Sequence, residues 1–271
     1  MPKSSRFMTA PQLHALLGSD ASVRVLDVRH MVGADRMRHV YEAGHIPGAV
    51  YVEMRDELAG PASAGRGGRN PLPQPDALQS HLHRWGVGAE STVVVYAGVG
   101  QPAAGRAWWV LTWAGVPVRI LAGGYEAWVT AGFPVTTGTV TPETPTPPPS
   151  TRTVRPGQLP DVTVAEVPAY AQRGQLVDVR PRTDFEQGHI PGAVNLPYTG
   201  LTGTDDLPLA ARDIQALLAA QGVDHDAPVA LTCGGGVAAA WSAAILEDAG
   251  IRSVLHAGSW SEWCTRPGLS A

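Results

Sequence analysis

An internal repeat constrains the fold of this chain more than any other feature of its sequence. The six residues of His45–Val50, His-Ile-Pro-Gly-Ala-Val, return unchanged as His189–Val194. Three further pairs of segments match in the same order along the chain: Val25–Arg29 with Leu176–Arg180, Val93–Tyr96 with Val229–Thr232, and Ala122–Trp128 with Ala257–Trp263. The repeating unit is as long as an ordinary domain, whereas solenoid repeats are much shorter. We therefore expect two homologous domains.

A proline-rich stretch separates the two copies. Residues 136–160 contain seven prolines, which cannot donate backbone hydrogen bonds and which favour an extended chain. We therefore expect one domain over residues 1–135, a linker over residues 136–160 and a second domain over residues 161–271. The composition of the linker fits a semi-rigid strap and a disordered spacer equally well.

Each copy alternates short apolar runs with helical patterns. Strands that are apolar throughout are typical of a parallel sheet that is buried on both faces. The expected strands are 23–28, 93–96, 118–121, 176–179, 229–232 and 253–256, and the expected helices are 10–17, 75–85, 103–114, 210–221 and 237–249. Glycines follow these helices, as is common at helix ends: Gly18, Gly86, Gly115, Gly222 and Gly250. The sequence predicts an α/β fold twice over, each domain a parallel sheet covered by helices on both faces.

Composition excludes several functional classes. The 271 residues carry 20 Lys and Arg against 24 Asp and Glu, a net charge of −4, so no basic field exists to bind nucleic acid. The longest apolar stretches fall well short of the ~20 residues of a membrane span, and the first residues lack the apolar core of a secretory signal. Two cysteines cannot form a disulfide framework and suit a reducing compartment. We expect a soluble, cytoplasmic protein.

Cys233 is the candidate nucleophile. It ends an apolar strand pattern and opens the run Cys233-Gly234-Gly235-Gly236, directly before the helix expected at residues 237–249. Backbone N–H groups at the start of a helix have no partners within the helix, and they stabilise the negative charge of a thiolate. Consecutive glycines allow such groups to converge on one point, and a glycine run serves no packing purpose in a strand. The alternative, a buried apolar cysteine, does not explain the glycines.

The first copy acts as an internal control. It has Ala97 at the position of Cys233, so that copy has no nucleophile. Features that both copies share are therefore interpreted as structural, through salt bridges and turns: Asp27 and Asp178, Arg29 and Arg180, His45 and His189, and the Ile-Pro-Gly-Ala runs. The thiol and its glycines distinguish the second copy, and we expect the chemistry there.

Taken together, these motifs resemble the rhodanese sulfurtransferases in their tandem form, with an inactive first domain that lines the cleft and an active second domain. The order of Asp-x-Arg, Gly-His-Ile-Pro-Gly-Ala, strand–Cys–glycine loop–helix and Gly-Ser-Trp-Ser-Glu-Trp covers essentially the whole chain. The run Cys233–Ala239 is similar to the Cys-Gly-Ser-Gly-Val-Thr-Ala loop of 3-mercaptopyruvate sulfurtransferases, with Gly235 at the serine position. Thiosulfate-preferring members carry Arg and Lys directly after the cysteine, and this loop has neither.

The resemblance implies a double displacement. The Cys233 thiolate takes sulfur from thiosulfate or 3-mercaptopyruvate, and the resulting persulfide passes it to cyanide, a small thiol or a thioredoxin-like protein. The backbone of the loop would bind the outer sulfur through Gly234, Gly235, Gly236, Val237 and Ala238. No cofactor is implied. The alternative is a persulfide carrier or thiol sensor of the same fold without turnover, which a loop free of charged and hydroxyl side chains would also suit.

The resemblance also points to residues outside the loop. Arg182 is the closest counterpart of an arginine that binds the anionic donor in the family, although a solvated surface arginine is the alternative. His45 corresponds to a histidine that enters the cleft in mercaptopyruvate enzymes, although its presence in both copies favours a structural role. Asp35 and Arg36 are candidates to line the cleft, with solvated loop charge as the default. Cys264 is interpreted as a packed free thiol, with a regulatory partner of Cys233 as the alternative.

Other chemistries fit poorly. Cysteine phosphatases need an arginine six residues after the nucleophile, where this chain has Ala239. The nine histidines include no His-Glu-x-x-His motif and the cysteines no zinc spacing, so we expect no metal.

Overall fold

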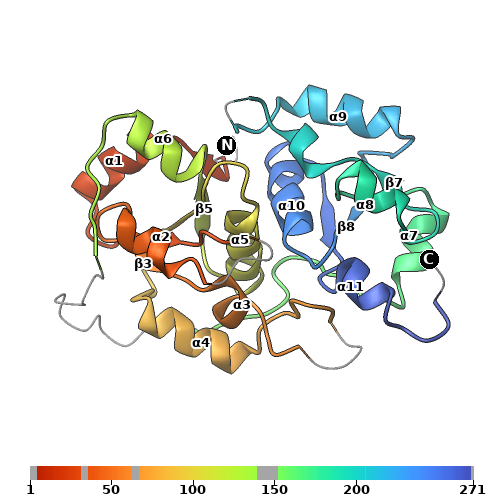
Figure 1. Ribbon diagram of the computed structural model, residues 1–271, viewed down its shortest axis with the longest axis horizontal. Coiled ribbons are helices and arrows are strands. Elements are labelled where there is room, and N and C mark those ends of the chain that lie inside the picture. The colour runs from red at the N-terminus through yellow and green to blue at the C-terminus, as the bar shows by residue number, and fades with distance from the viewer. Residues whose placement is uncertain (1–4, 32–35, 63–66, 139–151, 205, 270–271) are drawn as a thin grey trace. The chain divides into compact units, whose positions relative to one another are not determined.

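The computed structural model describes residues 5–31, 36–62, 67–138, 152–204 and 206–269 (Figure 1). The chain divides into two compact units. The first consists of Met1–Leu58 with Pro73–Gln158, and the second of Ala59–Leu72 with Leu159–Ala271. The boundaries expected from the sequence assign all of 59–72 to the first domain, whereas in the structure Ala59–Leu72 belongs to the second unit.

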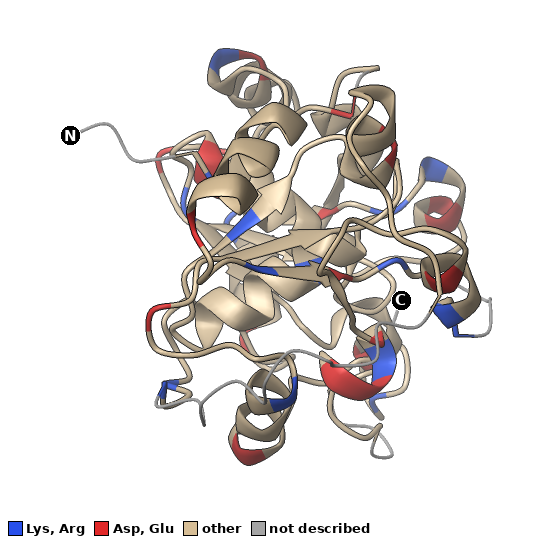
Figure 2. Cartoon of the chain, turned by 90° about the vertical axis from the view of Figure 1, so that its left-hand side faces the viewer, with Lys and Arg blue, Asp and Glu red and all other residues tan. Residues whose placement is uncertain are grey.

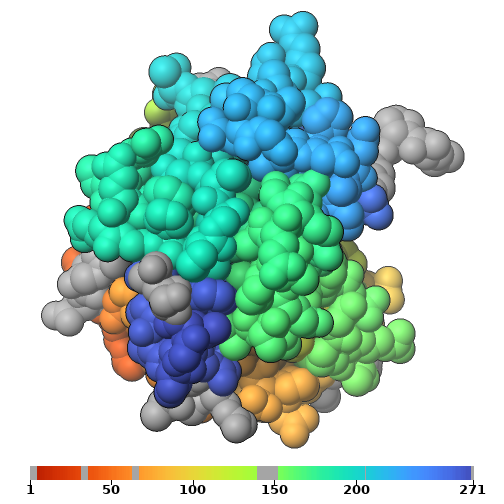
Figure 3. Space-filling model, turned by 90° about the vertical axis from the view of Figure 1, so that its right-hand side faces the viewer, coloured from red at the N-terminus to blue at the C-terminus, as the bar shows by residue number. Residues whose placement is uncertain are grey.

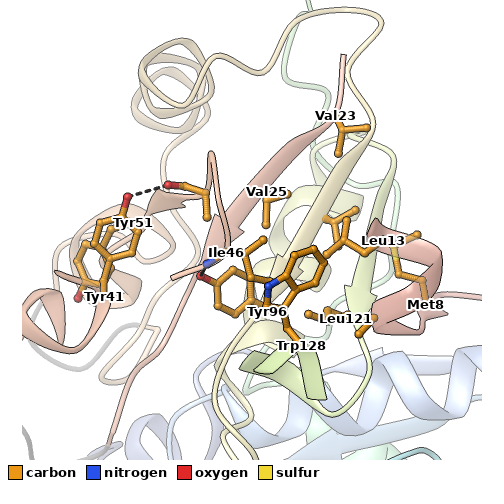
Figure 4. Close-up of a cluster of buried hydrophobic side chains, with 13 residues drawn as sticks. Met8, Leu13, Val23, Val25, Tyr41, Ile46, Tyr51, Tyr96, Leu121 and Trp128 are labelled. Carbon is orange, nitrogen blue, oxygen red and sulfur yellow. Dashed lines mark hydrogen bonds between the residues drawn. The ribbon is translucent and has the colours of Figure 1, made fainter. Parts of the chain in front are cut away.

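The first unit is a parallel sheet of five strands in the order β1-β5-β4-β2-β3. Helices precede and follow the strands along the chain. The elements are β1 Phe7–Met8, α1 Ala10–Ser19, β2 Arg24–Asp27, α2 Arg38–Ala43, β3 Val50–Tyr51, α3 Met54–Glu57, α4 Pro75–Arg84, β4 Val93–Tyr96, α5 Ala103–Trp113, β5 Val118–Leu121 and α6 Gly124–Thr130. Figure 4 shows one core cluster of this unit, in which the Trp128 ring lies among Tyr96, Leu121 and Leu13.

The second unit is a parallel sheet of four strands in the order β7-β6-β8-β9. Its elements are α7 Val167–Gln172, β6 Leu176–Asp178, α8 Arg182–Glu186, β7 Val194–Asn195, the 3₁₀ helix η1 Tyr198–Leu201, α9 Ala211–Ala220, β8 Val229–Thr232, α10 Ala238–Asp248, β9 Ser253–Leu255 and α11 Ser259–Trp263. Val167 of α7 and Trp263 of α11 belong to one apolar cluster, and Figure 3 shows these segments side by side on the surface of the unit.

The predicted α/β class, with one parallel sheet in each unit, is confirmed. Two-residue strands β1, β3 and β7 escaped prediction because each lies at a sheet edge and is too short for an apolar pattern. One glycine prediction is wrong: Gly18 lies within α1, which continues to Ser19. The glycines that follow α4, α5, α9 and α10 do adopt left-handed backbone angles, with φ between +70° and +82°.

The linker is ordered over residues 152–158, where backbone atoms of Arg155 and Gln158 donate to carbonyls at the end of α5. Its residues 139–151 lie outside the described part of the chain. No helix within the described residues is both long and apolar enough to span a membrane. Acidic and basic residues are scattered among each other over the cartoon in Figure 2, in keeping with the small net charge.

Candidate active site

Cys233 lies between the end of β8 and the start of α10, as the sequence predicts. β8 is an inner strand of its sheet, so this turn is at the carboxyl edge where α/β folds bind ligands. The thiol is buried, with 3% of the residue exposed. Its Sγ accepts a hydrogen bond from the backbone N–H of Gly236 at 3.1 Å. The backbone at the helix start therefore faces the sulfur and favours negative charge on it.

A different structural constraint favours glycine at each position of the run Gly234–Gly236. Gly236 has φ +78°, a left-handed angle that a side chain disfavours, and this turn aims its N–H at the sulfur. A Cβ on Gly234 would lie 3.0 Å from Nη2 of Arg69, and one on Gly235 would lie 3.0 Å from Nδ2 of Asn70. Two of the three glycines therefore leave room for another segment of the chain, which the sequence interpretation did not foresee.

That segment is Ala59–Leu72, which belongs to the second unit. Asn70 Nδ2 donates to the carbonyl of Gly235 at 2.7 Å, and the backbone N–H of Arg69 donates to Oγ of Ser261 at 2.9 Å. Residues far apart in sequence thus hold the cysteine loop from one side.

Ser259 holds the cysteine from another side. Its Oγ accepts the backbone N–H of Cys233 at 3.1 Å, donates to the carbonyl of His256 at 2.8 Å, and lies 3.7 Å from Sγ. The residue is fully buried and has φ +52°, a strained angle for any residue other than glycine. Strain of this kind gathers at functional sites, where the surrounding structure sustains it.

A buried polar network lies behind the loop. Nδ1 of His256 lies 3.3 Å from Oγ1 of Thr232, and Nε2 lies 3.7 Å from Oε2 of Glu262, slightly beyond hydrogen-bond distance. Glu262 also accepts from Arg266 at 2.8 Å. The His256 side chain first, and then Arg266 and the backbone N–H of Gly67, lower the pKa of Glu262 to about 2. The carboxylate is therefore ionised throughout the neutral range and anchors both α11 and the 67–70 turn.

The first copy lacks these polar groups. By the repeat alignment, Gly124 stands at the position of Ser259, and apolar Leu121 and Ala127 stand at those of His256 and Glu262. Gly124 shares the left-handed angle, at φ +58°, without the strain. The aligned motif has Gly-Gly in the first copy and Gly-Ser in the second, and this difference is the sequence signal that points to Ser259.

The shared Asp-x-Arg motifs form the predicted salt bridges. Arg29 donates to Asp27 and Arg180 to Asp178, each with a closest distance of 2.6 Å and both partners buried. The arginines also donate to the backbone carbonyls of Gly44 and Gly188. These hydrogen bonds hold the turn that begins each Gly-His-Ile-Pro segment. These contacts are structural in both copies.

In the described part of the chain, the two predicted donor-binding side chains outside the loop, Arg182 and His45, contact residues other than those of the cysteine loop. Arg182, 74% exposed, donates to Glu186 at 2.7 Å on the surface of α8. His45 is fully buried in the first unit, stacked on Tyr41 with Nδ1 2.9 Å from its carbonyl oxygen. His189 repeats this geometry on Phe185, which favours the structural interpretation. A substrate role for Arg182 and His45 stays a prediction.

The other candidates from the sequence are Asp35, Arg36 and Cys264. Arg36 forms an exposed ion pair with Asp56, and Asp35 lies outside the described residues. Both cysteines are free, but the interpretation of Cys264 as a packed thiol is wrong, because Cys264 is exposed at the end of α11. Among the described residues, no three His, Cys, Asp or Glu side chains are grouped closely enough to hold a metal ion.

Comparison with known proteins identifies the family. The profile of the rhodanese-like domain matches residues 9–131 and again residues 163–266. The chain belongs to the tandem-domain rhodanese family. It is 38% identical over 96% of its length to SseB of Mycobacterium tuberculosis, provisionally named a thiosulfate sulfurtransferase, and covers 94% of that protein. It is 30% identical to the 3-mercaptopyruvate sulfurtransferase of Escherichia coli, covering 92% of each chain.

Solved structures agree. The crystal structure of SseA from Escherichia coli, a 3-mercaptopyruvate sulfurtransferase, superposes with a TM-score of 0.82 at 27% identity, over 95% of this chain and all of that one. The rhodanese fold is therefore shown, and this rhodanese protein is a sulfurtransferase.

Proposed function

We propose that the protein moves a sulfane sulfur from an anionic donor to a thiol or cyanide through a persulfide on Cys233. The observation that carries this proposal is the 3.1 Å hydrogen bond from the Gly236 N–H to Sγ at the start of α10. A sulfur held in this way is stabilised as a thiolate, and the thiolate is the nucleophile of cysteine chemistry.

In the first half-reaction the Cys233 thiolate attacks the outer sulfur of the donor. With thiosulfate, the new S–S bond forms as the S–S bond of the donor breaks, and sulfite leaves with the electron pair. With 3-mercaptopyruvate, the C–S bond breaks, and the enolate of pyruvate leaves and takes a proton. Thiosulfate and 3-mercaptopyruvate are the donors that the names of the relatives give.

In the second half-reaction the acceptor attacks the outer sulfur of the persulfide. The S–S bond breaks and its electron pair returns to Cys233, which regenerates the thiolate. We assign the outer sulfur to the backbone N–H groups of Gly234, Gly235, Gly236, Val237 and Ala238, at the N-terminus of α10. The same donors serve both half-reactions, since the sulfur carries negative charge in each.

The acceptor would be cyanide in an assay and a small thiol or thioredoxin-like protein in the cell. Two free cysteines, one of them exposed, favour a reducing compartment such as the cytoplasm.

The Cys233→Ala variant tests the proposal, with Cys264→Ala as the matched control that removes the other thiol. We expect Cys233→Ala to form no thiocyanate from either donor while its circular dichroism spectrum is unchanged, and Cys264→Ala to keep its activity. Incubation with donor alone should add the mass of one sulfur atom to the wild type and to Cys264→Ala. Thiocyanate formation by Cys233→Ala at the wild-type rate would overturn the proposal.

A persulfide carrier is the second candidate, favoured by the burial of Cys233 and by the absence of hydroxyl and charged side chains from residues 234–239. Turnover separates the two. A carrier takes up one sulfur per chain and stops, whereas the enzyme continues to form product as long as donor and acceptor are present.

A further inference from the structure

We propose that Arg69 binds the anionic end of the sulfur donor and supplies the positive charge that the cysteine loop lacks. The proposal rests on the proposed sulfur transfer through Cys233 and adds to it a donor-binding side chain. Neither the repeat nor the loop motif points to this residue, which lies in the first half of the sequence but in the second unit of the structure.

The backbone of residues 67–70 is fixed against the turn that begins α11. Gly67 and Gly68 have left-handed angles of φ +71° and +66°. A Cβ on Gly68 would lie 2.2 Å from the carbonyl oxygen of Gly258 and 2.4 Å from Oγ of Ser261, so only glycine permits so close an approach. The N–H of Arg69 donates to the same Ser261 hydroxyl at 2.9 Å. The chain is therefore held where the Arg69 side chain starts.

The guanidinium of Arg69 lies along the cysteine loop. Its Nη2 is 3.0 Å from the position of a Cβ on Gly234, and its Nε is 3.5 Å from that on Gly235. Gly234 follows Cys233 directly, and consecutive Cα atoms are about 3.8 Å apart. The guanidinium therefore lies beside the residue next to the nucleophile, and in the proposed complex it contacts the anionic group of a donor whose sulfur meets Sγ of Cys233.

The charge of Arg69 is not neutralised within the described residues. Its side chain is exposed and forms no hydrogen bond or ion pair with any of them. Other arginines of this unit are committed: Arg180 to Asp178, Arg182 to Glu186 and Arg266 to Glu262. A guanidinium with free N–H groups matches the two oxygens of a carboxylate or a sulfonate, through parallel hydrogen bonds.

Asn70 is a positioning residue beside it. Its side-chain amide donates to the Gly235 carbonyl at 2.7 Å and ties the segment to the loop. The backbone of Arg69 is thus held beside the loop, which favours a donor held between cation and nucleophile.

The assignment predicts which half-reaction depends on Arg69. Thiosulfate and 3-mercaptopyruvate both carry an anionic group, whereas a neutral thiol acceptor such as 2-mercaptoethanol does not. Loss of the cation should therefore slow the loading of Cys233 and leave its discharge to a neutral thiol unchanged.

The test compares Arg69→Ala, Arg69→Met and Arg69→Lys with Arg212→Ala, a matched loss of an exposed arginine from the same unit. Loading is measured as persulfide formed at increasing thiosulfate concentration, and discharge as the release of sulfur from preloaded protein to 2-mercaptoethanol. We expect Arg69→Ala and Arg69→Met to raise the KM for thiosulfate about tenfold or more, with kcat and discharge within about twofold of wild type. Arg69→Lys should keep an intermediate KM, and Arg212→Ala a KM within about twofold of wild type.

Three results would overturn the assignment: an unchanged KM in Arg69→Ala and Arg69→Met, an equal rise in Arg212→Ala, or a discharge slowed as much as loading, which would make Arg69 a structural part of the loop. Arg69→Met retains an unbranched apolar side chain, so its KM for thiosulfate decides the test if Arg69→Ala lowers stability. Failure here is distinct from failure of the proposed function, because the latter requires that Cys233→Ala remain active.

Discussion

Two substitutions at Ser259 separate the strain at this position from the function of its hydroxyl. Ser259→Ala keeps the left-handed angle of φ +52°, which costs about 1–2 kcal/mol for a residue with a Cβ. It also leaves the buried N–H of Cys233 without its 3.1 Å acceptor, at about 1–3 kcal/mol. Ser259→Gly loses the same acceptor but relieves the strain. Allowing for the greater freedom of glycine in the unfolded chain, we expect Ser259→Gly to be the more stable variant by about 1 kcal/mol.

Stability is measured as the free energy of unfolding in urea, followed by the fluorescence of the tryptophans, and function as the rate of persulfide formation. Both variants should load sulfur more slowly than wild type, by a similar factor, because both lose the hydroxyl that orients Cys233. Gly124 occupies the same position in the first copy at φ +58°, so the backbone accepts glycine there. The reasoning would be refuted by a Ser259→Ala variant at least as stable as Ser259→Gly, or by wild-type loading in Ser259→Gly.

Three further substitutions test the surroundings of the sulfur. The pKa of Glu262 is lowered to about 2, so its carboxylate stabilises the fold above the ordinary pKa of 4.5 and this stability is lost as the pH falls toward 2. Glu262→Gln should therefore lower the free energy of unfolding at pH 7 by at most about 3 kcal/mol. The difference from wild type should shrink between pH 5 and pH 2. Urea titrations that show the same difference at every pH would contradict the ion-pair account. Gly236→Ala forces a side chain into φ +78° and should cost at least about 1 kcal/mol in urea while it slows loading, since the N–H leaves the sulfur; a variant that loads sulfur like wild type would exclude this N–H as the stabilising donor. Gly235→Ser should raise activity with 3-mercaptopyruvate relative to thiosulfate only when Asn70 is also replaced by Ala. The reason is that the new Cβ would lie 3.0 Å from Nδ2 of Asn70. An equal ratio of the activities with the two donors, with and without Asn70, would argue against that steric block.

The sequence predicts those parts of the site that local pattern determines. β8, Cys233 and α10 follow one another within twenty residues, so an apolar run, a glycine turn and a helical pattern suffice to place them. The parallel sheets follow from the apolar strands by the same reasoning. The duplication adds a comparison that no single domain offers, and it separates Cys233 from the shared salt bridges of Asp178 and Arg180.

Long-range contacts account for what the sequence did not predict. Asn70 and Gly235 are 165 positions apart, and no periodicity or spacing links them. The sequence predicts only an anion-binding role for the glycine run, whereas Gly234 and Gly235 also permit the approach of Arg69 and Asn70. In the sequence, a glycine is equally compatible with anion binding and with the close approach of another segment. Only the contacts in the folded protein distinguish the two.

The first copy shows why the fold alone does not make a nucleophilic site. Its loop after β4 also turns toward a helix, α5, but its backbone N–H groups already have acceptors within the protein. Oε1 of Gln101 accepts from His30 and, at 3.4 Å, from Gly98, while Oε2 of Glu126 accepts from Val99 at 2.8 Å. Negative charge from Glu126 at this loop opposes a second anion. In the second copy Glu262 stands at the position of Ala127, and its carboxylate is directed toward His256 and Arg266. Ser259 stands at the position of Gly124, beside the cysteine. The two loops thus differ in where their acidic side chains are directed, and that difference leaves the N–H of Gly236 to the sulfur of Cys233.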